Sequence, residues 1–306
     1  MSHAPSERWD LPGAQVRVRR VGDDSGPRPA AVFVHGLGGS SLNWVDLMPL
    51  LADEVDGLAL DLPGFGSSPP PRDGDYSPAG HARTVAAVIR QWQEMRGDDA
   101  PVHVFGNSMG GAVALQLAVR EPSLVDTLTL ISPALPTRRT RRGNAHLPVV
   151  AIPGLGESLL RRYLQVSAQA RVAATIDACF VDTASVSPAL REALTAEVVE
   201  RDRYPYVGDA FLSSLRGLLR TFADPSPQRP WALARRVTQP VLALYGEDDV
   251  LVHPSGARRA AREFPRGEVV LLSRTGHAAQ MEHPELVADL WRRTILDRAP
   301  RPAVSP

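Results

Sequence analysis

Val102-His-Val-Phe-Gly-Asn-Ser108-Met-Gly-Gly111 is the stretch that decides the fold of this 306-residue chain. An apolar, β-branched run ends in Gly-x-Ser-x-Gly, and an alanine-rich helical pattern follows at once. Strand, tight turn and helix in that order are typical of a nucleophile elbow, in which a strained turn lifts the serine hydroxyl above the edge of a sheet. Side chains at Gly106 and Gly110 are expected to collide with the neighbouring helix and strand. The backbone N–H of Met109 is expected at a helix N-terminus, where it can stabilise an oxyanion.

Buried strands and helices alternate on both sides of this stretch. An irregular, frayed start is expected at 1–13, followed by strands at 15–21, 30–34, 55–62 and 125–131 and helices at 43–52 and 77–96. Such alternation predicts a mostly parallel central sheet with helices on both faces, which is an α/β fold.

The alternation breaks at Ser132-Pro133. From there to about residue 236 the sequence predicts helices alone, at 156–169, 170–180, 188–202 and 207–221. Strands resume at 240–245 and 268–272, with helices at 254–263 and 284–296 and a disordered tail from 299 to 306. The sequence therefore predicts an α/β core of residues 1–132 and 237–306 that is interrupted by a helical cap of residues 133–236.

Composition narrows the function classes. The chain has 34 basic residues, all of them arginine, and 34 acidic residues, and this balance argues against a nucleic-acid-binding protein. The single cysteine, Cys179, excludes an intramolecular disulfide, and residues 1–10 contain no apolar leader. Both features favour the cytoplasm. Neither metal-ligand spacing nor a Gly-x-Gly-x-x-Gly motif occurs, so neither a metal nor a cofactor is expected.

A serine hydroxyl needs a base within hydrogen-bond reach, and the base needs an acid to orient it. His277 follows the strand expected at 268–272, and Asp248 and Asp249 follow the strand expected at 240–245. The carboxyl ends of parallel strands are where an α/β sheet places its catalytic groups. The chain order Ser, Asp, His is also that of α/β hydrolases, and it leaves either aspartate as the acid.

The chain as a whole resembles α/β-hydrolase-fold enzymes with a helical cap. The resemblance is carried by His35-Gly-Leu-Gly38, Asp61-x-x-Gly-x-Gly-x-Ser68, Gly106-Asn-Ser-Met-Gly-Gly111 and Gly276-His277. It implies Ser108 as nucleophile and His277 as general base and then general acid. It also implies Asp249 as the acid, three residues after a strand-ending glycine, and an oxyanion hole made by the N–H groups of Leu37 and Met109. His35 is expected to shape the oxyanion loop and Asp61 to hold the loop that follows it.

The serine argues against relatives that place an aspartate at the elbow, and carboxylic-ester hydrolysis through an acyl-enzyme is the first expectation. Asn107 and the segment 276–284 also resemble hydrolases that split carbon–carbon bonds in ring-cleavage products of aromatics or steroids. Those enzymes carry an aromatic residue where this chain has Ala278, and they use a cap arginine that the sequence does not single out here. A non-catalytic ligand-binding protein on the same scaffold is the third alternative.

The apolar helices of the cap predict a small to medium hydrophobic substrate. The cluster Arg138-Arg-Thr-Arg-Arg142 is expected to be a solvated linker. The apolar stretch at 147–160 beside it leaves contact with a membrane surface as an alternative. The sequence leaves the oligomeric state open.

Overall fold

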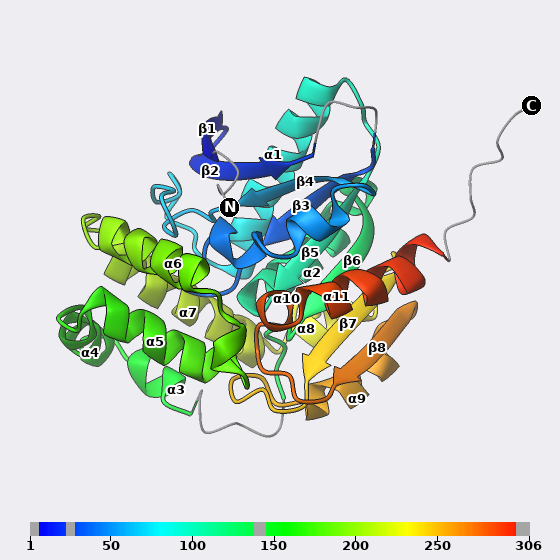
Figure 1. Ribbon diagram of the computed structural model, residues 1–306. Helices are drawn as coiled ribbons and strands as arrows, with labels where there is room; N and C mark the ends of the chain where they lie inside the picture. Colours follow the sequence, from blue (N-terminus) through cyan, green and yellow to red (C-terminus); the bar gives the residue numbers. More distant parts are fainter. Residues whose placement is uncertain (1–5, 23–27, 138–144, 298–306) are drawn as a thin grey trace, which may run out of the picture.

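A computed structural model describes residues 6–22, 28–137 and 145–297, and an eight-stranded sheet lies at its centre (Figure 1). The strand order is β1-β2-β4-β3-β5-β6-β7-β8, and all pairs from β4 to β8 are parallel, whereas β2 pairs antiparallel with both β1 and β4. The strands are β1 (Ser6–Leu11), β2 (Ala14–Val21), β3 (Ala30–Val34), β4 (Asp56–Leu60), β5 (Val102–Asn107), β6 (Val125–Ile131), β7 (Val241–Gly246) and β8 (Gly267–Leu272). The predicted mostly parallel α/β fold is confirmed.

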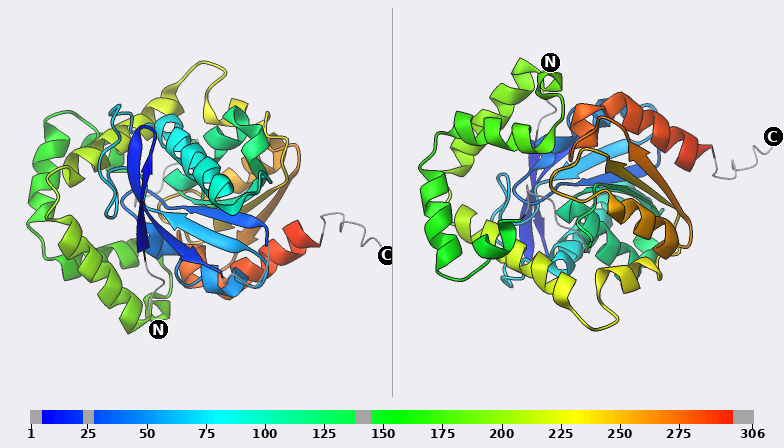
Figure 2. Two further views of the ribbon diagram at one scale, coloured as in Figure 1. Left: turned by 90° about the horizontal axis from the view of Figure 1, so that it is seen from above. Right: turned by 90° about the horizontal axis from the view of Figure 1, so that it is seen from below.

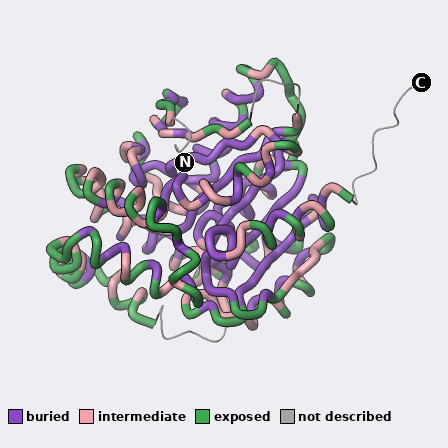
Figure 3. Tube along the Cα trace, in the orientation of Figure 1, coloured by how far each residue is buried: buried purple, intermediate pink, exposed green. Residues whose placement is uncertain are grey.

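Helices cover both faces of the sheet, as Figure 2 shows from opposite sides. One face carries α1 (Pro78–Arg96), α2 (Met109–Arg120), α8 (Pro230–Ala234) and α9 (Ser255–Glu263). The other carries the 3₁₀ helices η1 (Ser41–Trp44) and η2 (Met48–Leu51), then α10 (Ala279–Glu282) and α11 (Pro284–Trp291). The central strands are therefore buried on both sides (Figure 3). In β3, Val32 and Val34 join the first layer, whereas Ala31 and Phe33 join the second, as the two-residue period of a strand requires.

The N-terminal prediction was wrong for the residues that the structure describes. Instead of a frayed start, β1 forms a hairpin with β2, in which Trp9 pairs with Val16 and Leu11 with Ala14. Trp9 and Leu11 are buried with the exposed Asp10 between them, but Glu7 and Arg8 are both exposed, so the alternation covers only three residues. Gly13 makes the tight turn at φ +87°, a conformation that glycine adopts without strain. Residues 1–5 and the tail 298–306 lie outside the described part of the chain.

The described residues between β6 and β7 form helices and no strand. These are α3 (Leu147–Val150), α4 (Leu155–Leu164), α5 (Ala168–Cys179), η4 (Thr183–Ser185), α6 (Pro188–Arg201), α7 (Val207–Ala223) and α8. Figure 1 shows α3 to α7 grouped at one side of the sheet. The boundary between the expected helices at 156–169 and 170–180 lies a few residues earlier, because Ser167 caps α5 by accepting a hydrogen bond from the N–H of Ala170 at 3.3 Å. The expected helix at 43–52 is two short 3₁₀ helices, and α3 and α8 were not predicted.

In the described ranges, no helix is both long enough and apolar enough to cross a bilayer.

Candidate active site

Ser108 lies between β5 and α2 in the conformation of a strained elbow. Its φ of 53° and ψ of −117° are rare for a residue with a side chain, and such strain persists only where the surrounding structure enforces it. Here the Ser108 N–H donates to the carbonyl of Ile131 at 3.0 Å, and the Ser108 carbonyl accepts from the N–H of Ala134 at 2.8 Å. Both partners belong to β6 or to the residues just after it. The side chain is half-buried, so its hydroxyl remains reachable.

The elbow needs glycine on both sides of the serine. A Cβ on Gly106 would lie 2.5 Å from the carbonyl oxygen of Gly110 in α2. A Cβ on Gly110 would lie 2.1 Å from the carbonyl oxygen of Val34 in β3. Both clashes are with backbone, which cannot move aside cheaply. The predicted collisions with helix and strand are confirmed.

Asp249 and His277 form a direct pair at the carboxyl ends of β7 and β8. Asp249 Oδ2 lies 2.8 Å from His277 Nδ1, and both side chains are buried. Asp249 Oδ1 accepts from the N–H groups of Leu251 and Val252 at 2.7 and 2.9 Å. Burial pushes the pKa of Asp249 upward, but the charge and hydrogen bond of His277 and these two N–H groups outweigh it, so the net pKa is lowered. An ionised Asp249 fixes the proton of His277 on Nδ1 and leaves Nε2 able to accept one.

Asp248, the other aspartate considered, is exposed and does not contact His277. Its N–H donates to the carbonyl of Thr275 at 3.1 Å, which joins the two loops without involving its carboxylate. Of the two, Asp249 is the residue whose carboxylate reaches the histidine.

Backbone contacts from three directions hold the loop of His277. The Asn107 side-chain amide donates to the carbonyls of His277 and Ile131, both at 3.1 Å, so the residue next to Ser108 is bonded to the histidine loop. The His277 N–H donates to the carbonyl of Cys179, at the end of α5, at 2.7 Å. The Glu282 carboxylate accepts from the N–H of Gly276 at 2.7 Å. Because both amide hydrogens of Asn107 are used in this way, neither is left for a substrate.

The loop after β3 lies against the elbow. The Cα of Gly36 faces Ser108 so closely that a Cβ would lie 3.1 Å from the Ser108 Cβ. Leu37 is next in a turn closed by the Gly39 N–H and the Gly36 carbonyl at 3.1 Å. Met109 is the first residue of α2, where a helix does not use the N–H. The structure thus brings the segments that carry Leu37 and Met109 to the same place beside Ser108.

His35 and Asp61 hold the loop after β3 in place by hydrogen bonds to backbone groups. His35 accepts the Leu62 N–H at Nε2 (2.9 Å), so its proton is on Nδ1, 2.7 Å from the Gly36 carbonyl oxygen. Burial lowers the pKa of His35 and keeps the ring neutral. The Asp61 carboxylate accepts from the N–H groups of Ser41 and Ser67 at 2.8 and 2.9 Å. These contacts agree with the structural parts expected of both residues.

Residues of α6 and α7 that sequence reasoning missed contact the loop after β3. Arg201 of α6 donates from Nη1 to the Gly38 carbonyl at 2.8 Å, and Glu197 of the same helix accepts from the Ser40 hydroxyl at 2.7 Å. Phe211 of α7 lies over Gly38, 3.5 Å from where a Cβ would stand. Arg201 and Glu197 lie one helical turn apart, but no sequence pattern selects Arg201 among so many arginines.

Two clefts of about 650 and 470 Å³ lie elsewhere, one between the 74–77 loop and α7 and one between α4 and the start of α7. Ser108, Asp249 and His277 line neither of them. Among the described residues, no three His, Cys, Asp or Glu side chains are grouped so that they could hold a metal ion.

Comparisons with known proteins find relatives along most of the chain. A model described as the alpha/beta hydrolase family matches residues 31–290. The chain is 32% identical over 286 residues to the dihydrolipoyllysine-residue acetyltransferase component of the acetoin cleaving system of Pseudomonas putida, covering 92% of this chain and 66% of that protein. It thus spans slightly less than two thirds of that relative's length.

The chain is also 27% identical over 272 residues to a 2-hydroxy-6-oxononadienedioate/2-hydroxy-6-oxononatrienedioate hydrolase of Dechloromonas aromatica, covering 87% of this chain and 85% of that one. Among solved structures, a bacterial membrane phospholipase A superposes with a TM-score of 0.75 at 23% identity, covering 96% of this chain and 86% of that one. The matched family residues run from β3 to α11 and include the elbow and the loops that carry Asp249 and His277. The chain belongs to the alpha/beta hydrolase family.

Proposed function

We propose that this hydrolase cleaves carboxylic esters of small to medium hydrophobic substrates through an acyl-enzyme. Ser108 attacks the ester carbonyl, and His277 takes the serine proton at Nε2. His277 then returns this proton to the leaving alcohol, and water releases the acid by the reverse exchange. Asp249 orients the ring and stabilises its cationic form, and the N–H groups of Leu37 and Met109 stabilise the tetrahedral oxyanion.

The observation that carries the proposal is the buried Asp249–His277 pair, at 2.8 Å, whose loop is hydrogen-bonded to Asn107, the residue that precedes Ser108. A hydroxyl at a strained elbow beside an imidazole oriented by a carboxylate suits acyl transfer. The apolar ring of Phe211 over the oxyanion loop supports a hydrophobic substrate. The single cysteine, Cys179, supports a cytoplasmic location.

The test is hydrolysis of a series of p-nitrophenyl esters by the wild type, Ser108→Ala and His277→Ala. We expect either substitution to lower kcat by about six orders of magnitude, the loss typical of removing one member of such a unit. A fluorophosphonate should label Ser108 in the wild type and should leave Ser108→Ala unlabelled. An unlabelled wild-type protein with intact ester turnover would contradict an acyl-enzyme at Ser108.

Carbon–carbon bond hydrolysis is the second candidate, because the relative from Dechloromonas aromatica is named for a dienedioate and trienedioate substrate. Arg201 is the cap arginine that reaches the oxyanion loop, and its Nε is buried without a hydrogen-bond partner among the described residues. A substrate carboxylate could use that N–H. Two features weaken this candidate. Asn107 donates both amide hydrogens to backbone carbonyls, and Ala278 packs among apolar residues of α5 and α6.

A vinylogous diketone acid separates the two reactions. An esterase should turn over p-nitrophenyl butyrate and leave the diketone acid intact. A carbon–carbon hydrolase should prefer the diketone acid, and Arg201→Gln should then raise KM for this acid far more than KM for a neutral ester. A protein that binds either compound without turnover would instead be a ligand-binding member of the family.

A further inference from the structure

We propose that α3 and α4 of the cap form a docking surface for an anionic lipid bilayer. The surface consists of six apolar side chains, which we call the α3–α4 face: Val149, Ile152, Leu155, Leu159, Tyr163 and Val166. Each of them is 36–49% exposed. Twelve large apolar side chains are exposed in the described ranges, and half of them lie in these 18 residues. Scattered exposed apolar residues are ordinary, but a contiguous group marks an interaction surface.

The α3–α4 face is the outer side of an amphipathic helix. Leu155, Leu159 and Tyr163 recur at intervals of four residues, so they share one side of α4, and Val166 follows just after the end of the helix. The other side faces α7, because Leu160 lies 3.3 Å from where a Cβ on Gly208 of α7 would stand, and Glu157 accepts from Arg216 of α7 at 2.8 Å. Packing within the cap therefore uses only one side of the helix. Figures 1 and 2 place α4 at the outer edge of the molecule, away from the sheet.

The charges around the face are positive. Arg161 and Arg162 are exposed on α4, Arg162 beside Leu155 and Leu159 and Arg161 at the cleft toward α7. Glu157, the one acidic residue between 138 and 166, has its carboxylate occupied by Arg216 at 2.8 Å and by the Gly154 N–H at 2.7 Å. The sequence adds four arginines just upstream, in the cluster at 138–142, which lies outside the described residues and is not needed to define the surface.

Anionic lipid fits this surface better than a second copy of the chain. Aliphatic and tyrosine side chains flanked by arginines are typical of helices that lie in a membrane interface, where the apolar side enters the acyl region and the guanidinium groups meet lipid phosphates. Two copies meeting face to face would bring Arg161 and Arg162 close to the same residues of the partner, and these like charges would oppose self-association.

The experiment is co-sedimentation of the full chain with vesicles of phosphatidylcholine alone or mixed with phosphatidylglycerol. We expect binding to the mixed vesicles that is about tenfold stronger than to phosphatidylcholine and that weakens as salt is added. Leu155→Glu with Leu159→Glu should abolish binding, whereas Arg161→Gln with Arg162→Gln should remove the preference for phosphatidylglycerol. The substituted side chains are exposed, so the variants should keep the wild-type Tm.

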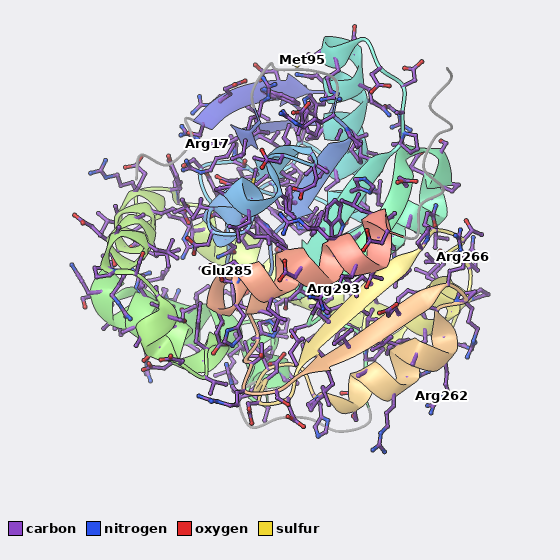
Figure 4. All side chains as sticks on the ribbon, turned by 45° about the vertical axis from the view of Figure 1, so that its right-hand side comes forward. Arg17, Met95, Arg262, Arg266, Glu285 and Arg293 are labelled. Carbon is purple, nitrogen blue, oxygen red and sulfur yellow. The ribbon has the colours of Figure 1, made fainter. Side chains whose placement is uncertain are left out.

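Matched controls lie on the opposite end of the molecule. Arg262 and Arg266 are exposed near α9 and β8, far from α4 in Figure 4, and Arg262→Gln with Arg266→Gln should bind like the wild type. Leu286→Glu, at an exposed leucine on α11, controls for loss of apolar surface in general. Ser108→Ala should also bind unchanged, which separates docking from capture of lipid at the active site.

Three outcomes would overturn the proposal. The first is a wild type that binds neither vesicle. The second is a loss of binding in the Arg262 and Arg266 control that equals the loss in the α4 variants. The third is the absence of vesicle binding together with a dimer, seen in sedimentation velocity, that Leu155→Glu with Leu159→Glu dissociates. The last outcome would assign the α3–α4 face to a second copy of the chain.

Discussion

The carboxylate of Glu282 accepts a hydrogen bond from the backbone N–H of Gly276 at 2.7 Å, and Gly276 directly precedes His277. The other carboxylate oxygen accepts from the N–H groups of Val181 and Asp182, at 2.7 and 2.9 Å, in the cap segment between α5 and α6. One buried side chain therefore bonds the cap to the histidine loop. Met281 and Ala278 belong to the same apolar cluster as cap residues, so packing joins the two parts at the same place.

Glu282→Gln should weaken both the fold and turnover. A glutamine keeps the size of the side chain but replaces one acceptor oxygen by an NH₂ group that faces backbone N–H donors. Leaving buried donors unsatisfied costs about 1–3 kcal/mol. We expect urea unfolding to show that loss and ester kinetics to show a larger fall in kcat than change in KM, because His277 would be misplaced.

Glu285→Gln is the matched control for that substitution. Glu285 is exposed on α11 and is labelled in Figure 4, so its change should alter the free energy of unfolding by less than about 0.5 kcal/mol. Equal kinetics in both variants would show that the Glu282 contact has no part in positioning His277.

Asp249→Asn and Asp248→Asn should differ sharply in activity. Asn at 249 can no longer supply the charge that holds the proton on His277 Nδ1, and comparable changes in other serine hydrolases cost about four orders of magnitude in kcat. Asp248 is exposed, and its backbone N–H, not its carboxylate, bonds the carbonyl of Thr275. Its substitution should therefore change kcat by about twofold or less. Steady-state ester kinetics decide between them, and a dead Asp248→Asn with an active Asp249→Asn would invert the assignment.

Gly110→Ala should prevent the native packing of the elbow. The added methyl would stand 2.1 Å from the carbonyl oxygen of Val34, so backbone must shift, at a cost of about 3 kcal/mol or more. The comparison is Gly208→Ala in α7, where the nearest atom is the tip of Leu160 at 3.3 Å and alanine favours the helix. Thermal unfolding should show a lower Tm for Gly110→Ala and a nearly unchanged or higher one for Gly208→Ala.

Acid should destabilise the contact between the cap and α1 through His81. This histidine is buried and its Nε2 lies 3.2 Å from the Ser214 hydroxyl of α7, and burial, followed by the electrostatic influence of nearby His35, lowers its pKa to about 3. The unfolded chain, with a pKa near 6.5, then binds more protons than the native state between these two values. The stabilisation is complete above pH 6.5 and is lost as the pH falls below it.

From pH 7 to pH 5 this single group should cost about 2 kcal/mol of unfolding free energy. Urea unfolding of the wild type and of His81→Gln at both pH values isolates the effect, since all other groups are shared. The glutamine variant should lose about 2 kcal/mol less than the wild type over this interval. Identical losses in the two proteins would contradict a neutral, buried His81.

The sequence alone determined the parts of this protein that local chemistry controls. The Gly-x-Ser-x-Gly turn between an apolar strand and a helix fixed the elbow, because only glycine fits where backbone meets backbone. Continuous apolar runs in β3, β5 and β7 identified buried parallel strands, since both of their faces are covered. By contrast, β1 was missed because its alternation of buried and exposed residues is limited to Trp9-Asp10-Leu11, which is too short to predict a strand without the pairing with β2.

Tertiary structure decided which side chains meet across long sequence separations. Asp249 and Asp248 are adjacent in the chain, but the turn after β7 buries one against His277 and leaves the other in solvent. In the sequence, Asn107 resembles a residue of the hydrolases that split carbon–carbon bonds. In the folded chain, its side-chain amide donates a hydrogen bond to the backbone carbonyl of His277. Glu282, Arg201 and Glu197 gave no local signal, because their partners are backbone groups and side chains that only the folded chain brings within hydrogen-bond distance.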